Sequence, residues 1–355
     1  MHAVFYRKVD PNTEPMRLQK LLPLPQLAAA AAEFPLEAAL SVLTPQVPVL
    51  RETFIGVASA ALGGDRLAAE YLLLHVVSRI YTRVQGLCLG QFCLNINSVA
   101  AAAPPMHTPA RQISQLLDSL LPTVHTFELS VANLNSTTMI PKKDYDQNRL
   151  VAGMLQLANG TELLVDETRM DEGQLNENGV ANLKAMAGIS QTGTLELDFG
   201  NYGNVSIDMD VSMLTLSSQK SLLPSSCTIP HVPQAASQDI SGALDPATGE
   251  PALSGMRAYL AVMREVSSRG PREMDDEASG DAAAAELKFE ISSEAEEHVQ
   301  RDFVACRKTD RTLKAEDLHR WLTMARLFAI SHGDTKVRPS SASRLPHLPA
   351  SHISD

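Results

Sequence analysis

Cysteine is scarce in this chain of 355 residues, which contains four. No two of them have the CxxC spacing, and none lies beside histidines at the spacing of a zinc site. The ten histidines include no HExxH pair. The sequence therefore predicts no disulfide framework and no metal site, and it predicts reduced, mostly buried thiols in a nuclear or cytosolic protein. The four thiols are Cys88, Cys93, Cys227 and Cys306.

An excess of basic residues and a long apolar run are also missing. The 30 Lys and Arg against 41 Asp and Glu give a net charge of -11, so the chain has no overall positive field to hold a phosphate backbone. Direct sequence-specific binding of nucleic acid is therefore not expected. The start, "MHAVFYRKVD", becomes charged before a signal-peptide region develops, and the later apolar runs are too short to span a bilayer, so no membrane partner is expected.

The chain also lacks the G-x-x-x-x-G-K-[ST] phosphate loop of ATPases and the G-x-S-x-G elbow of serine hydrolases. What it has is an acid pair, because the apolar run in "ELLVDE" leads directly to Asp166 and Glu167. At the end of a buried strand, such acids hold Mg²⁺ and activate water in P-loop ATPases. The alternative is that Asp166 caps the next turn while Glu167 faces solvent.

Hydrophobic residues make up 44% of the chain, enough for one large domain and a smaller one. Strand-like and helix-like patterns alternate over residues 63–232, which predicts an α/β domain with a mainly parallel sheet and helices on both faces. The expected helices cover 67–81, 111–121 and 176–188, and the expected strands lie within 91–96, 125–133, 149–155, 162–167, 194–200 and 204–218.

Composition divides the rest of the chain. Prolines cut the Leu- and Ala-rich residues 1–62 into a helical lead-in, and residues 233–254 are expected to form a linker. A helical, lid-like subdomain is expected over 255–333, with helices opening at Ser293 and covering 315–331. It contains a solvated acidic insertion, 267–286, and the tail 334–355 is expected to be disordered.

A glycine turn, Gly63-Gly64, precedes the long apolar helix that leads into this domain. Asp65 can cap that helix, and no lysine follows in it. Glu70 would repel a triphosphate there, since like charges about 4 Å apart at an effective dielectric of about 20 cost roughly 4 kcal/mol. ATP binding at this turn is therefore not expected.

Several stretches together resemble the mini-chromosome maintenance (MCM) complex-binding protein family of plants and animals. The similarity covers nearly the whole chain, and the N-terminal half of the family is absent from this sequence. The stretches that carry it are "ALGGDRLAAEYLLLHVVSRIYTR", "KDYDQNRLVAGMLQLANGTELLVDET", "GQLNENGVANL" and "SLLPSSC".

That family is similar to the MCM helicase subunits, so the resemblance implies an AAA-like fold, a degenerate MCM-type ATPase with a helical lid. Asp166 and Glu167 match its acid pair. If "GDRLAAEYLL" aligns with the phosphate loop at Gly64 and Asp65, Glu70 replaces the lysine and Tyr71 the metal-binding serine. Softer alignments put Ser217 or Ser218 at the sensor-1 asparagine, Ser225 at the arginine finger and Glu316 at the sensor-2 arginine.

The resemblance implies a nuclear, non-catalytic adaptor or chaperone that uses no cofactor. It would bind MCM helicase subunits and meet chromatin through them. The implied roles are MCM assembly and supply, release from chromatin late in DNA replication, and sister-chromatid cohesion. The alternative is an enzyme, a divergent ATPase using Asp166 and Glu167 with an unconventional phosphate site. A direct DNA-binding module is a third possibility, disfavoured by the acidic balance.

Overall fold

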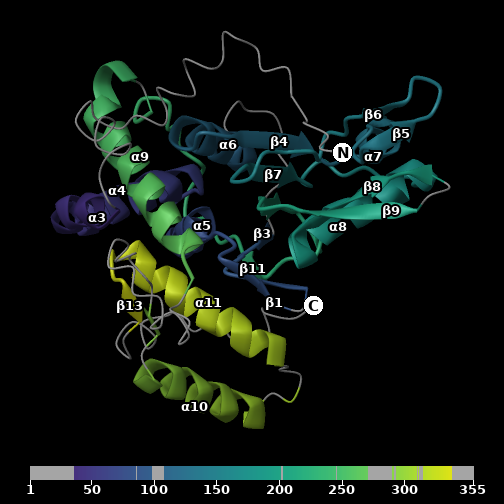
Figure 1. Ribbon diagram of the computed structural model, residues 1–355. Coiled ribbons are helices and arrows are strands. Elements are labelled where there is room, and N and C mark those ends of the chain that lie inside the picture. The colour runs from purple at the N-terminus through teal and green to yellow at the C-terminus, as the bar shows by residue number, and fades with distance from the viewer. Residues whose placement is uncertain are drawn as a thin grey trace.

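The computed structural model describes residues 36–84, 86–97, 108–200, 203–244, 246–270, 290–291, 293–309, 311 and 315–337. Figure 1 shows helices gathered around a central sheet, with a smaller strand-rich arm projecting from it. The start of the predicted lead-in, most of the predicted acidic insertion and most of the predicted tail lie outside the described residues. Across the described residues, each helix is too short or too polar to cross a bilayer.

A five-stranded parallel sheet forms the centre of the molecule, with the strand order β11-β3-β10-β7-β4. The register aligns Leu164 of β7 with Leu214 of β10 and Thr126 of β4. This confirms the predicted mainly parallel sheet. The bounds are β3 (Leu94–Asn97), β4 (Val124–Glu128), β7 (Glu162–Asp166), β10 (Ser212–Leu216) and β11 (Cys227–Pro230).

Helices cover both faces of this sheet. Alternate residues of its strands point to opposite sides, so each face supplies apolar side chains that the helices bury. Leu164 joins the larger core cluster, while Leu163 and Val165 join the smaller one. The larger cluster takes in side chains of α3 (Leu36–Leu43), α4 (Val47–Ala61), α5 (Arg66–Val77) and α6 (Pro109–Leu120), with the 3-10 turn η1 (Thr44–Gln46) between the first two. The smaller cluster contains α7 (Val131–Ser136) and α8 (Glu177–Thr192).

Three of the predicted strand segments, 149–155, 194–200 and the first part of 204–218, contribute to a second sheet, which we call the β-arm. Its order is β6-β5-β8-β9, and β8 and β9 form an antiparallel hairpin. The sequence analysis placed these strands in the central sheet. In β8 the exposed Glu196 lies between the buried Leu195 and Leu197, and β9 is exposed except for the half-buried Ile207, so both strands have a solvated face. The bounds are β5 (Lys142–Asp144), β6 (Arg149–Val151), β8 (Thr194–Asp198) and β9 (Asn204–Asp208).

The C-terminal helices pack onto the larger core cluster. The helix α9 (Pro246–Ser268) begins inside the predicted linker, and its Tyr259 donates a 2.6 Å hydrogen bond to the carbonyl of Ser331. α10 (Ser293–Thr309) and α11 (Ala315–Ser331) begin where the sequence predicted. Two short pairs complete the described elements, β1 (Thr82–Val84) with β2 (Leu87–Leu89) and β12 (Glu290–Ile291) with β13 (Lys336–Val337).

Candidate functional site

The carboxyl ends of parallel strands are the usual place for a ligand site in an α/β protein, at the point where the connections change direction. Here the chain leaves β3 through α6 toward β4 at one edge, whereas it leaves β10 toward β11 at the other. The connections therefore change direction between β3 and β10, and β7 delivers Asp166 and Glu167 at the same edge of the sheet. The predicted buried, acid-ended strand is confirmed.

Asp166 is used by the turn that follows its own strand. Its Oδ1 accepts a 2.9 Å bond from the backbone N–H of Thr168 and a 2.6 Å bond from the Thr168 hydroxyl. This is an Asx turn, in which a short acidic side chain replaces a backbone acceptor. The alternative in which Asp166 caps the next turn is therefore confirmed.

Glu167 is tied to the loop after β10. Its side chain accepts a 2.9 Å bond from the Ser221 hydroxyl and a 3.3 Å bond from the Leu222 N–H. The residue is 5% exposed, so the expectation that Glu167 faces solvent is wrong. Burial raises the pKa of this carboxyl above its ordinary value, and the hydrogen bonds from Ser221 and Leu222 partly oppose that rise.

Polar side chains at the ends of β3 and β10 meet where the connections change direction, and those of Asn95 and Ser217 are buried. The Ser217 hydroxyl lies 3.0 Å from Oδ1 of Asn95 and 3.4 Å from Oδ1 of Asn97. The sequence analysis missed both asparagines, although their spacing of two in the apolar stretch "LNIN" signals polar residues on one face of a strand. Arg169 lies at the same edge and pairs with Glu128 at 3.3 Å.

The start of α5 is closed by the chain's own backbone. Asp65 caps the helix, as predicted, by accepting from the N–H of Ala68, and its other oxygen accepts from the N–H of Val232. Gly63 has a φ of 64°, and a Cβ added to it would lie 2.4 Å from the carbonyl oxygen of Ala235. The N-terminal end of α5 therefore has no space for a phosphate group next to Gly63.

The structure differs from the expected alignment of "GDRLAAEYLL" in what precedes the helix. A phosphate loop joins a strand to a helix. Gly63 and Gly64 instead join α4 to α5, before the first strand of the central sheet. Val232, which contacts Asp65, follows β11, and β11 lies three strand spacings from β7, about 14 Å. The six expected positions therefore form two separate groups.

Glu70 and Tyr71 lie on α5, in the same group as Asp65. Glu70 pairs with Arg66 one turn earlier, at 3.5 Å. Tyr71 is 1% exposed in the core, and burial raises the pKa of its hydroxyl, with smaller contributions from Cys227 and Glu70. Both residues therefore have structural roles within α5 and its packing.

The softer alignments concern polar residues of three other segments. Ser217 is buried directly after β10, and Ser218 is exposed beside it. The Ser225 hydroxyl lies 3.0 Å from that of Thr228. The side chain of Glu316 is outside the described residues.

The described part of the chain shows no cluster of three or more His, Cys, Asp or Glu that could hold a metal ion. At the carboxyl edge of the sheet, Asp166 accepts hydrogen bonds from Thr168, and Glu167 accepts them from Ser221 and Leu222. The site therefore presents a row of hydrogen-bonded polar and acidic groups. These hydrogen bonds hold the loops after β7 and β10 in place.

Comparison with known proteins gives one consistent family. Mini-chromosome maintenance complex-binding proteins match at 34% identity in Salmo salar, 34% in Arabidopsis thaliana and 32% in Homo sapiens. The matches cover 84%, 81% and 81% of this chain, but 44%, 44% and 41% of those relatives. The chain thus spans less than half the length of these curated relatives. The model of the family described as "Mini-chromosome maintenance replisome factor" matches residues 1–348, and the chain belongs to that family.

Proposed function

We propose that this protein is a non-catalytic, nuclear factor that binds the MCM complex and acts in DNA replication. The observation that carries the proposal is the family match over residues 1–348. The names of its relatives state that they bind the MCM complex, and their similarity covers more than four fifths of this chain. The finer roles proposed are MCM assembly and supply, release from chromatin, and sister-chromatid cohesion.

The strand order of the central sheet supports an AAA-type module. Numbered along the chain, the strands stand in the order five, one, four, three, two. This is the order expected for the core sheet of an AAA-type ATPase, with the acid pair after the third strand, where Asp166 and Glu167 lie. In such a module the phosphate loop follows the first strand, which corresponds here to residues 98–107.

The residues available for phosphate binding support a non-catalytic role. A phosphate loop needs glycines to approach the phosphates and a lysine to neutralise them. Residues 98–107 read SVAAAAPPMH and contain neither. The Glu167 carboxylate, which would activate water, is held by Ser221 and Leu222. In the described part of this edge of the sheet, a triphosphate would lie beside the acidic side chains of Asp166 and Glu167, which would oppose its binding.

The mechanism we propose is mimicry of an MCM subunit. A domain with the shape of an MCM ATPase module can occupy the place of a neighbouring subunit without completing an ATP site. Because no nucleotide is bound at the contact, hydrolysis does not drive its formation or release. Such an association stays reversible, as the assembly and removal of a complex require.

Co-purification tests the proposal directly. The chain, carrying an affinity tag, is expected to retain the purified MCM complex, and a full-length relative serves as the positive control. If neither protein retains the MCM complex, the proposed partner is wrong. If only the full-length relative does, the binding surface lies in the part of the family that this chain lacks.

A thermal-shift assay separates the proposal from a divergent ATPase. A ligand at 100 times its Kd stabilises a fold by about 2.7 kcal/mol. We expect no shift with MgATP, and a stabilisation of that size would favour the enzyme that uses Asp166 and Glu167.

A further inference from the structure

The outer edge of β9 has no neighbouring strand in the part of the chain that the structure describes. β9 stands at the end of the order β6-β5-β8-β9, and its register with β8 runs without a bulge from Asn204 to Asp208. Figure 1 shows the β-arm projecting from the body of the molecule. Sheet edges of soluble proteins are commonly blocked by lysine, proline or a bulge, and β9, with the sequence NVSID, has none of the three. The edge can therefore accept a further strand.

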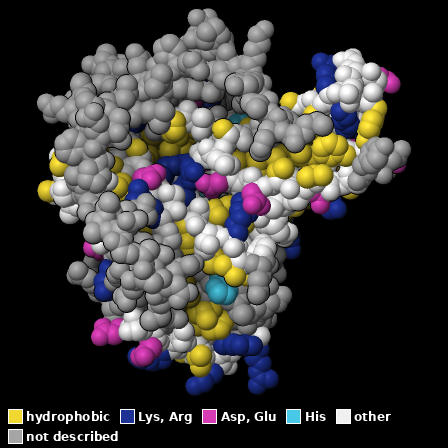
Figure 2. Space-filling model, viewed as in Figure 1, with side chains coloured by type: hydrophobic (Ala, Val, Ile, Leu, Met, Phe, Trp, Pro, Cys, Tyr) yellow, Lys and Arg dark blue, Asp and Glu magenta, His cyan; other side chains and the backbone are white. Residues whose placement is uncertain are grey.

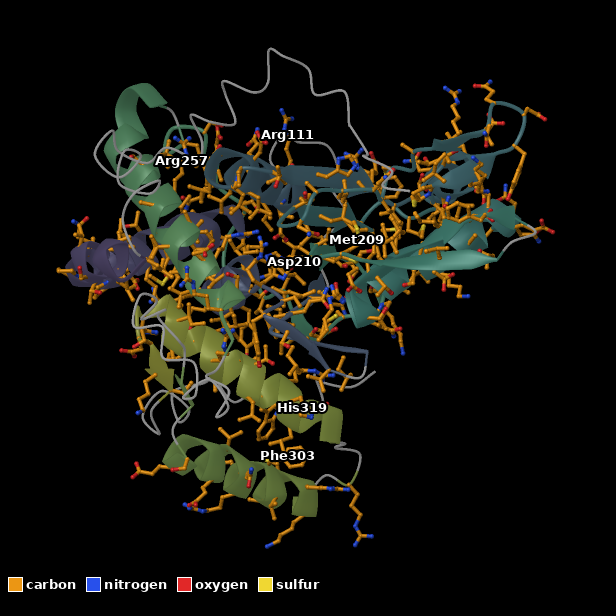
Figure 3. All side chains as sticks on the ribbon, in the orientation of Figure 1. Arg111, Met209, Asp210, Arg257, Phe303 and His319 are labelled. Atoms are coloured by element: carbon orange, nitrogen blue, oxygen red, sulfur yellow. The ribbon has the colours of Figure 1, made fainter. Side chains whose placement is uncertain are left out.

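Hydrogen bonds at the two ends of the hairpin of β8 and β9 show which backbone groups of β9 point outward. Met209, which is labelled in Figure 3 and follows β9, donates its N–H to the carbonyl of Gly193 at 2.7 Å. At the other end, Phe199 donates its N–H to the carbonyl of Gly203 at 3.2 Å. Because bonds to one neighbour recur at every second residue of an antiparallel strand, the odd-numbered residues of β9 bond to β8. The residues whose N–H and C=O groups point away from β8 are Asn204, Ser206 and Asp208.

The side chains of β9 form a pattern that is symmetric about Ser206. Val205 and Ile207 precede and follow it, and both point to the face of the β-arm that meets the smaller core cluster. Val205 is nevertheless 51% exposed, and Ile207 is half-buried. Figure 2 shows apolar side chains gathered along the β-arm on the face in view. Asn204 and Asp208 end the strand on the opposite face, so in either direction β9 reads polar, apolar, serine, apolar, polar.

We propose that β9 pairs with β9 of a second copy of this chain, in an antiparallel register centred on Ser206. The outward backbone groups then bond to one another, because Asn204 lies opposite Asp208 of the partner subunit and Ser206 lies opposite Ser206 of the partner subunit. Val205 lies opposite Ile207 of the partner subunit, at the positions where side chains of paired strands approach most closely. Two-fold symmetry repeats each of these contacts. The proposal goes beyond the function proposed above, because it concerns contacts between copies of this chain.

The end residues of β9 can also bind each other across the two copies. The side chain of Asp208 is 72% exposed, although it lies 3.7 Å from Arg83. The Asn204 amide donates one N–H to Glu196 at 3.0 Å, and its second N–H has no acceptor among the described residues, so it can donate to a carboxylate. An extended segment of another protein could pair with the same backbone groups, but it would match these side chains only by carrying the same pattern. A second copy of the chain always carries it.

Sedimentation equilibrium on the whole chain tests the proposal. A contact of one strand per copy is small, so the dimer is expected to be weak, and the chain is studied from about 1 to about 300 μM. We expect the average mass to rise over this range from that of one chain toward that of two. Since each copy has a net charge of -11, added salt should strengthen the association. A mass that stays at one chain throughout would overturn the proposal and leave the edge to a strand of another protein.

Two substitutions of Ser206 separate backbone pairing from other contacts. Ser206→Pro removes the outward N–H, and an edge strand tolerates proline where that N–H faces away from the sheet. This substitution is expected to raise the dimer Kd at least about tenfold. Ser206→Ala keeps the N–H and is expected to change the Kd by less than about twofold. Equal effects of the two substitutions would contradict pairing at this edge.

Two lysine variants guard against misfolding of Ser206→Pro, because both keep the backbone N–H and add the same charge to the same exposed face of β9. Ser206→Lys puts two lysines opposite each other, so it should weaken the dimer at least about tenfold. Asn204→Lys puts each lysine opposite Asp208 of the partner subunit, so it should tighten the dimer at least about threefold. If both variants change the affinity in the same direction, the register centred on Ser206 is wrong.

Discussion

At the scale of single residues, the acid pair shows how a catalytic-looking motif can serve a loop. Asp166 replaces a backbone acceptor in its own turn, and Glu167 satisfies the hydroxyl of Ser221 and the N–H of Leu222. Both acids lie where a parallel sheet delivers catalytic groups. Their donors lie in the turn after β7 and in the loop after β10, so the carboxylates brace two loops that follow neighbouring strands.

Replacing Glu167 by Gln should leave the fold intact, because an amide can both accept from Leu222 and donate to the Ser221 hydroxyl. Glu167→Ala should lower the free energy of unfolding by about 0.5–1.5 kcal/mol, since it removes the acceptor of two part-buried hydrogen bonds. Urea unfolding of the three proteins measures both effects. A loss in Glu167→Gln as large as in Glu167→Ala would contradict the bracing role.

A comparison of Glu167→Gln with the wild type also predicts how the free energy of unfolding depends on pH. The pKa of Glu167 is raised in the folded state, so its stabilising contribution is complete below its unfolded pKa and is lost as pH rises through the folded pKa. Gln does not titrate. The free energy of unfolding of Glu167→Gln minus that of the wild type should therefore increase from about pH 4 to about pH 7. A difference that stays flat or falls over that range would contradict it.

At the scale of elements, the sequence predicted those segments whose local pattern and environment agree. The final helix was predicted at 315–331 and spans those residues, because it is amphipathic and packs one face on the core. The strand 162–166 was predicted because a strand buried on both faces is apolar throughout. The capping role of Asp65 was readable for a similar reason, since a cap is a local interaction.

The sequence did not predict which strands pair with one another, nor where α9 begins. The alternation in "TLELD" indicates a strand with one solvated face, but it does not show that the strand pairs with β9, since partners are chosen by contacts distant in sequence. The first turns of α9 were assigned to a linker because Pro246, Gly249 and Pro251 suggest a loop. Tertiary packing of the later part of α9 outweighs that composition.

A buried charged group joins three elements at the amino edge of the sheet. Nε2 of His75 in α5 lies 2.5 Å from Glu162 of β7, and Arg264 of α9 lies 4.0 Å from the other oxygen of Glu162. The Nδ1 of His75 lies 2.6 Å from the carbonyl of Phe92. With Nδ1–H donated to that carbonyl, the contact with Glu162 requires a proton between His75 and Glu162.

Glu162→Gln should therefore destabilise the protein by about 3–5 kcal/mol, the usual cost of removing one partner from a buried charge pair. The matched control is Glu128→Gln, at the other end of the neighbouring strand, whose half-exposed pair with Arg169 should contribute less than about 1 kcal/mol. Urea unfolding of both variants measures the difference. Equal losses would mean that the buried group has no special structural role.

At the scale of the whole molecule, the described helices before and after the sheet share one core. The larger cluster joins residues of α4, α5 and α6 with residues of α9 and α11. Tyr259 is fully buried and bonds to the carbonyl of Ser331, which ties α9 to the end of α11. The lid-like subdomain expected over 255–333 thus contributes side chains to the same core as the sheet.

This shared core predicts that the C-terminal helices and the sheet unfold together. Trp321, the one tryptophan of the chain, lies on α11 and packs against the larger cluster, so its fluorescence reports that region, whereas far-ultraviolet circular dichroism reports the whole chain. The two urea transitions should coincide. Tyr259→Phe should lower the free energy of unfolding by about 1 kcal/mol, because it removes one buried donor from the Ser331 carbonyl. Both transitions should therefore move to lower urea concentration by the same amount. A tryptophan transition that precedes the circular dichroism transition, or moves alone in Tyr259→Phe, would instead mean that α11 unfolds as a separate unit.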